Sequence, residues 1–141
     1  MLLERFTALG VLTSSDSAST LQLEMPAALA SPGQARRALR RACERWGVTG
    51  PPGEAAELLA TELVTNAVIH AGTPVLMMAE HDGHNLTIAV SDGEARLPTL
   101  SPVNVMAEHG RGVGIIDELG ATWGVQRTVL GKTVWVSLGT T

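Results

Sequence analysis

Apolar residues in the first half of the chain are spaced as in two amphipathic helices. Over residues 32–46 they recur every three or four positions, which places them on one face of a helix with about 3.6 residues per turn. Ser31 has the chemistry of an N-cap and Pro32 suits the first helical position, while Gly47 predicts the end of this helix. A second helix is expected over residues 52–71.

The remaining segments are typical of short strands separated by turns. In these segments apolar and polar residues alternate, or a short apolar run lies between turn residues. Asp82-Gly83 is a tight hairpin signal between two such runs. The expected strands cover residues 21–25, 74–80, 86–91, 122–129 and 133–138, and a short helix is expected over residues 113–119.

The order of these elements predicts an α+β fold. Consecutive strands joined by tight turns run antiparallel. The expected architecture is therefore a two-layer sandwich, in which helices cover one face of a mostly antiparallel mixed sheet. Residues 13–20 are small and polar, so we expect a flexible N-terminal segment over residues 1–19 and one domain over residues 20–141.

Composition narrows the classes of function. Hydrophobic residues make up 45% of the 141 residues, which is enough for the core of one domain. The formal net charge is −4, so direct binding of nucleic acid is not expected. Cys43 is the single cysteine and cannot build a disulfide framework, and no apolar run reaches the roughly 18 residues of a membrane span. We expect a cytoplasmic protein without membrane contact.

A column of polar residues runs along the second predicted helix. Glu62, Asn66 and His70 are spaced four apart, and apolar residues such as Leu59 and Leu63 surround them on the same side of the helix. Glu62 and Asn66 are therefore expected to face the core, where polar side chains need partners. Two interpretations are open: a structural hydrogen-bond network, or a site whose oxygens hold a ligand or a hard ion such as Mg²⁺.

Two further features carry possible binding chemistry. Asp92 ends an apolar run and precedes Gly93, so it is either an ordinary turn residue or a carboxylate that accepts a hydrogen bond from an amino group such as that of adenine. Gly110-Arg111-Gly112-Val113-Gly114 places glycines at alternate positions before a predicted helix, so its backbone can approach an anion closely. The plainer interpretation is a flexible loop.

Two further patterns in the sequence have simpler interpretations than a ligand site. Gly131-Lys132-Thr133 is similar to the end of a P-loop, but Gln126 stands where that motif requires glycine. His81 and His84 could bind a metal, although two histidines in a hairpin turn without nearby cysteines are more often structural.

In this order, Glu62-Leu63-Val64-Thr65-Asn66-Ala67-Val68-Ile69-His70, the strand ending in Asp92 and the run Gly110-Arg111-Gly112-Val113-Gly114-Ile115 resemble the GHKL ATPase superfamily, whose members share the Bergerat ATP-binding fold. Within it, the chain is similar to the anti-sigma-factor serine/threonine kinases. The resemblance covers roughly residues 20–138.

The resemblance implies ATP and Mg²⁺ as ligands and a role for each motif position. Asn66 would bind the Mg²⁺ that bridges the ATP phosphates, Glu62 would be the general base, and Asp92 would accept a hydrogen bond from the adenine amino group. The lid residues would cradle the phosphates: Gly110, Arg111, Gly112, Val113 and Gly114.

Family members also use an arginine of the first helix in the transfer step, and by position this is Arg36. The alternative interpretation is that Arg36 belongs to a solvated basic face. That face would consist of Arg36, Arg37, Arg40, Arg41 and Arg45.

The implied function is an ATP-binding anti-sigma factor. It would phosphorylate a serine or threonine of an anti-sigma-factor antagonist and would sequester a sigma factor, often as a homodimer. The family often carries Asp-x-Gly-x-Gly after the strand, whereas this chain has Asp92-Gly93-Glu94-Ala95-Arg96. That difference motivates an alternative, a catalytically weak or inactive regulator of the same fold that binds ATP or a protein. A histidine-kinase fragment is less expected from the length of the chain, because it includes no helical dimerisation segment with a phosphoaccepting histidine.

Overall fold

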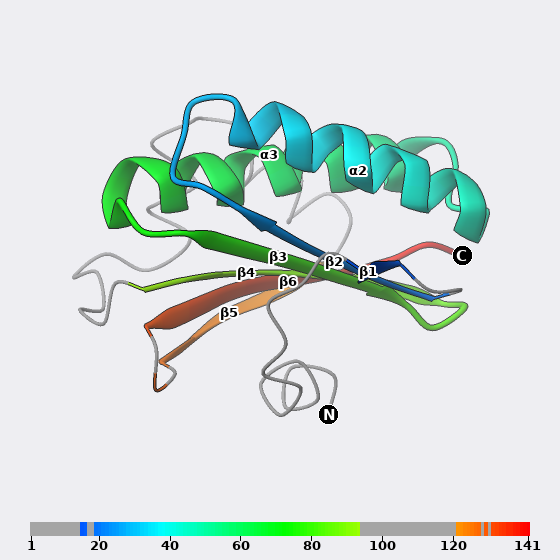
Figure 1. The fold of residues 1–141 in the computed structure, drawn as a ribbon. Coiled ribbons are helices and arrows are strands. Elements are labelled where there is room, and N and C mark those ends of the chain that lie inside the picture. Colours follow the sequence, from blue (N-terminus) through cyan, green and yellow to red (C-terminus); the bar gives the residue numbers. More distant parts are fainter. Residues whose placement is uncertain (1–14, 17–18, 94–120, 128, 130) are drawn as a thin grey trace.

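Two helices cover one face of an antiparallel sheet (Figure 1). The structure is a computed structural model that describes residues 15–16, 19–93, 121–127, 129 and 131–141. Its described elements are β1 (Ser15–Asp16), β2 (Thr20–Met25), α2 (Ser31–Trp46), α3 (Pro51–Ala71), β3 (Val75–His81), β4 (Asn85–Asp92), β5 (Thr122–Arg127) and β6 (Lys132–Gly139).

The six strands lie in the order β1-β2-β3-β4-β6-β5. Each of the five neighbouring pairs is antiparallel. The predicted α+β two-layer sandwich is confirmed, and within the described strands the sheet has no parallel pair. Since β6 lies between β4 and β5, the first residue of β6 is brought beside the last residue of β4, and Asp92 pairs with Lys132 in the register.

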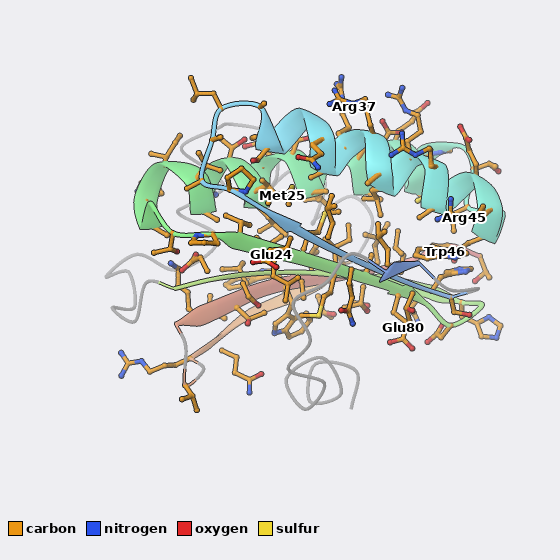
Figure 2. All side chains as sticks on the ribbon, in the orientation of Figure 1. Glu24, Met25, Arg37, Arg45, Trp46 and Glu80 are labelled. Carbon is orange, nitrogen blue, oxygen red and sulfur yellow. The ribbon has the colours of Figure 1, made fainter. Side chains whose placement is uncertain are left out.

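The sheet has one face in the core and one face away from the helices. Alternate residues of β3 and β4, such as Met77 and Ile88, are fully buried in the main apolar cluster with residues of both helices. Figure 2 shows Met25 on the helix side of the sheet and Glu80 on the other side. A smaller cluster around Met78 lies apart from the main core. Successive side chains of a strand point to opposite faces of the sheet, so only every second residue of each strand can face the helices.

The start of α2 differs from its prediction. Ser31 is not the N-cap but the first residue of α2, and the N-cap is Ala30, which makes no capping hydrogen bond through its side chain. The Ser31 hydroxyl instead donates a 2.7 Å hydrogen bond to the carbonyl oxygen of Pro26. This bond ties the start of α2 back to the turn that follows β2. The expected end is confirmed, because Gly47 has a φ of 72° and closes the helix.

The second helix and the hairpin after it follow their predictions closely. α3 ends at Ala71, and Gly72 adopts a φ of 66°. In the hairpin between β3 and β4, Asp82 Oδ1 accepts the amide N–H groups of His84 and Asn85 at 2.9 and 2.7 Å. These two bonds lower the pKa of Asp82. Gly83 has a φ of 98°, which glycine adopts without strain.

Three expectations concern segments that border the residues that the structure does not describe. Ser15–Asp16, within the segment expected to be a flexible link, forms a short strand that pairs with β2. The strand expected over residues 122–129 ends at Arg127. The helix expected over residues 113–119 lies outside the described residues. Neither described helix combines the length and the apolar composition that a membrane crossing requires.

Candidate nucleotide-binding site

The polar column of α3 faces the sheet, as the helical spacing predicted. Glu62 is 3% exposed and Asn66 is 7% exposed, although both are polar. Each makes contacts within the protein. His70 lies in the last turn of α3 and is exposed, so it does not continue the buried part of the column. The structure therefore confirms the inward position of the first two members of the column and separates the third from them.

The end of β4 carries a buried carboxylate on the same side of the sheet. Leu86, Ile88 and Val90 alternate along β4 and belong to the main core, so Asp92 follows them on the face that α3 covers. Asp92 is 7% exposed. α3 packs directly against β4 and β6. The helix carrying Glu62 and Asn66 is thus the element that lies over the strand carrying Asp92.

A hydrogen bond ties the chain after β4 to the turn after α3. The amide N–H of Gly93 donates to Thr73 Oγ1 at 2.8 Å. A Cβ added at Gly93 would lie 3.2 Å from the same Oγ1, which is a tight contact. In Figure 1 the end of α3, the end of β4 and the start of β6 meet at one end of the molecule. The candidate site lies at this end.

Lys132 forms a buried ion pair with Asp92. Its Nζ lies 3.0 Å from Oδ1 and 2.9 Å from Oδ2 of the carboxylate. The two side chains are only 10% and 3% exposed. Removal of two charges from water is costly, and the pair is tolerated because each charge compensates the other at short distance. Asp92 is therefore held as half of a neutral pair.

Sequence reasoning did not include Lys132 in the site. A signal was present, because Lys132, Val134, Val136 and Leu138 alternate along a strand whose apolar members face the core. A lysine at the first position of such a face needs an acidic partner. The identity of that partner depends on the pairing of β4 with β6, which the sequence pattern alone does not show.

Gly131, the residue before β6, lies against the end of β4. A Cβ built at Gly131 would collide with the carbonyl oxygen of Asp92 and would lie 2.8 Å from Gly93 Cα. Only a residue without a side chain fits there. The absence of a side chain at Gly131 lets β6 begin close to β4, so that the next residue, Lys132, lies beside Asp92 on the core face.

Arg36 does not join this buried group. It is exposed on α2, as are Arg37, Arg40, Arg41 and Arg45. Figure 2 shows Arg37 pointing away from the sheet. Arg40 Nη2 lies 2.8 Å from Glu57 Oε1 on α3, and this contact raises the pKa of Arg40. The described structure therefore fits a basic surface on α2, and a catalytic role for Arg36 stays a prediction.

The remaining predicted positions are either outside the description or structural. The lid residues Gly110, Arg111, Gly112, Val113 and Gly114 lie outside the described residues. The ring of His81 stacks on Trp46 with centroids 6.3 Å apart, and its Nε2 lies 2.8 Å from Thr140 Oγ1. These contacts favour the structural interpretation of the hairpin histidines.

The residues present suit a nucleotide better than a metal alone. Over the described ranges, no group of three or more His, Cys, Asp and Glu side chains could hold a metal ion. Mg²⁺ usually keeps several waters and binds substrate phosphates with one or two protein oxygens, which Asn66 can supply. Asp92 offers acceptors and Lys132 offers donors at one end of the same layer. This donor set fits a Mg²⁺-nucleotide.

Comparison with known proteins agrees with this assignment. No curated protein matches the chain significantly. The histidine kinase-like ATPase domain matches residues 25–138, which include α2, α3, the strands β3 to β5 and all of β6 except Gly139. The match covers most of the chain and includes every position that carries the candidate site. The protein belongs to the histidine kinase-like ATPase domain family, and membership of this family implies that it binds ATP.

Proposed function

We propose that this protein is an anti-sigma factor with protein serine/threonine kinase activity. It binds ATP with Mg²⁺, transfers the γ-phosphoryl group to a serine or threonine of an anti-sigma-factor antagonist, and sequesters a sigma factor, as a homodimer. Membership of the histidine kinase-like ATPase domain family supports ATP-dependent chemistry. The observation that carries the proposal is the pair of buried polar side chains, Glu62 and Asn66, on the helix that packs over the strand of Asp92.

The chemistry assigned to these residues is mainly positioning and charge stabilisation. The oxygen of the Asn66 side chain would hold Mg²⁺, and this ion would neutralise charge on the phosphate oxygens. The partner hydroxyl oxygen attacks the γ-phosphorus, the bond to the ADP leaving oxygen breaks, and Glu62 accepts the hydroxyl proton. Glu62 is 3% exposed, so its carboxylate is shielded from bulk water. Arg36 would assist from the exposed face of α2.

A second function has its own support. The turn after Asp92 continues as Gly93-Glu94-Ala95-Arg96, and Asp92 itself is bound by Lys132. Both features favour a regulator of the same fold that binds ATP or a protein partner without transferring phosphate. The two functions differ in one observable, which is the appearance of phosphate on the partner.

The first experiment is isothermal titration of ATP with Mg²⁺ into the wild type and Asn66→Ala. We expect binding by the wild type and a large loss in the variant. The matched control is Thr65→Ala, because Thr65 is the neighbouring residue of α3 and its hydroxyl donates to the Thr61 carbonyl oxygen at 2.6 Å, within the helix itself. Absence of wild-type binding would contradict the kinase proposal.

The second experiment follows phosphate transfer from γ-labelled ATP to purified antagonist proteins of the host. Glu62→Ala should abolish labelling and leave ATP binding largely intact, since the base contacts the partner hydroxyl rather than the nucleotide. Transfer at the wild-type rate by Glu62→Ala would show that Glu62 is not the base. Tight ATP binding without labelling of any antagonist would favour the non-catalytic regulator.

A further inference from the structure

The buried ammonium group of Lys132 has one N–H donor that no described residue accepts. An ammonium has three N–H donors. Its two hydrogen bonds both go to Asp92, and no third acceptor from the described residues lies within reach of Nζ. The side chain is 10% exposed, so bulk water is largely excluded from it. A buried donor without a partner is costly, which points to an acceptor that arrives with a ligand.

The pair presents an acceptor and a donor side by side. Asp92 accepts N–H groups through its carboxylate, which takes two hydrogen bonds from Lys132. Lys132 can donate its third N–H next to that carboxylate. The Watson–Crick edge of adenine has the complementary order, because the 6-amino group donates and the adjacent ring nitrogen N1 accepts.

We propose that Lys132 is a base-recognition residue, which donates a hydrogen bond to N1 of adenine while Asp92 accepts from the 6-amino group. This inference rests on the proposed function, in which Asp92 binds the adenine ring. It adds a residue to the site and a physical basis for the choice of base. Guanine in the same orientation would place its 6-oxo group against the Asp92 carboxylate and its N1–H against the Lys132 ammonium, which are two repulsive contacts.

The Asp92–Lys132 ion pair is also held rigidly, as the recognition of one particular base requires. Asp92 and Lys132 are cross-strand partners in the β4–β6 ladder, so their backbones are fixed by sheet hydrogen bonds. The contact of Gly131 with the backbone at Asp92 allows no side chain between the two strands at this point. The donor and the acceptor are therefore presented by one rigid corner of the sheet.

The test compares ATP analogues by titration calorimetry on the intact protein. In 1-deaza-ATP a C–H replaces N1, and in 7-deaza-ATP the change lies on the far edge of the base and serves as the control. Loss of one hydrogen bond from a charged donor corresponds to roughly 10- to 100-fold weaker binding of 1-deaza-ATP by the wild type. We expect 7-deaza-ATP to bind as ATP does. Equal affinity for ATP and 1-deaza-ATP would overturn the proposal.

The variant Lys132→Met should remove this discrimination, so that ATP and 1-deaza-ATP bind with similar affinity. Removal of the lysine leaves a buried carboxylate, and Lys132→Met combined with Asp92→Asn is the charge-matched companion in case the single variant does not fold. Tighter ATP binding by Lys132→Met than by the wild type would overturn the proposal, because it would mean that the lysine competes with the base for Asp92.

A separate readout needs no substitution, because Lys132 is the only lysine of the chain. Its reductive methylation can be followed by peptide mass spectrometry with and without ATP. Recognition predicts slower methylation with ATP, whereas displacement of the lysine by the base predicts faster methylation and contradicts the proposal. If the wild type binds no ATP at all, the proposed function fails as well. If ATP binds and depends on Asn66 but not on N1, only the role of Lys132 fails.

Discussion

The amide N–H of Gly93 donates a 2.8 Å hydrogen bond to Thr73 Oγ1, and this bond joins the residue after β4 to the turn after α3. The helix that carries Asn66 and the strand that carries Asp92 are thus linked next to the candidate site. A shift of one element relative to the other would change the separation of the groups assigned to phosphate and to base.

We expect Thr73→Val to weaken ATP binding and to lower the free energy of unfolding by about 0.5–1.5 kcal/mol, because valine has the same shape but cannot accept the Gly93 N–H. Thr73→Ser keeps the hydroxyl and is the control. The measurements are urea unfolding and ATP titration. A Thr73→Val protein with wild-type stability and wild-type affinity would show that the link is dispensable.

For the Asp92–Lys132 pair, we expect each single substitution to lower the free energy of unfolding more than the double substitution does. Lys132→Met or Asp92→Asn leaves one charge of the pair buried without the other, and we expect each to lower the free energy of unfolding by about 3–5 kcal/mol. The double variant Asp92→Asn with Lys132→Met has no such charge and should recover much of the loss. Denaturant unfolding of the four proteins forms a double-mutant cycle. Additive losses would mean that the two side chains do not stabilise one another.

Gly131 predicts a steric effect close to the site. Gly131→Ala forces the backbone at Asp92 to move, since the added Cβ collides with its carbonyl oxygen. We expect a loss of about 1–3 kcal/mol in the free energy of unfolding, together with weaker ATP binding. Gly139→Ala, at the other end of β6, is the matched control because nothing lies within 4 Å of its added Cβ. Similar behaviour of the two variants would contradict the close approach.

Cys43 predicts a dependence of stability on alkaline pH. Burial raises the pKa of its thiol from 9.0 to about 11. Above pH 9 the unfolded chain loses this proton before the folded chain does, so the contribution to stability is complete below pH 9 and is lost as pH rises toward about 11.

The measurement is urea unfolding of the wild type and Cys43→Ala between pH 8 and about pH 11. The difference between the two proteins isolates the contribution of the thiol from that of the other groups that titrate in this range. As a second readout, alkylation of the folded wild type near pH 8 should be slow and should become fast on unfolding. Rapid alkylation of the native protein would show that the thiol is accessible.

Features that depend on neighbours in sequence were predictable. The ends of α2 and α3 follow from Gly47 and Gly72, whose left-handed backbone closes each helix. The burial of Glu62 and Asn66 follows from helical periodicity, because both lie among apolar residues on one side. Ser31 is the exception, since its hydroxyl bonds to Pro26 in the preceding turn rather than to an amide of its own helix.

Features that depend on strand pairing were not predictable from local pattern. Asp92 and Lys132 are 40 residues apart, and they meet only because β6 lies between β4 and β5. The side of α2 on which Arg36 lies was also ambiguous, because it borders the apolar stripe, and packing leaves it exposed. The predicted phosphate contacts of the glycine-rich lid stay predictions.

The opposite end of the domain is held together by a different set of contacts. Trp46 stacks on His81, and Thr140 bonds both to His81 Nε2 and to the carbonyl oxygen of His84. The end of α2, the β3–β4 hairpin and the C-terminus, where these residues lie, are at the opposite end of the molecule from the end of β4 (Figure 1). Natural proteins often trade stability for activity where one region must serve both. In this domain the two demands fall on opposite ends. Substitutions that stabilise the end with the Trp46–His81 contact therefore need not affect the candidate site. The end with the candidate site can in turn change its ligands and partners without loss of these stabilising contacts.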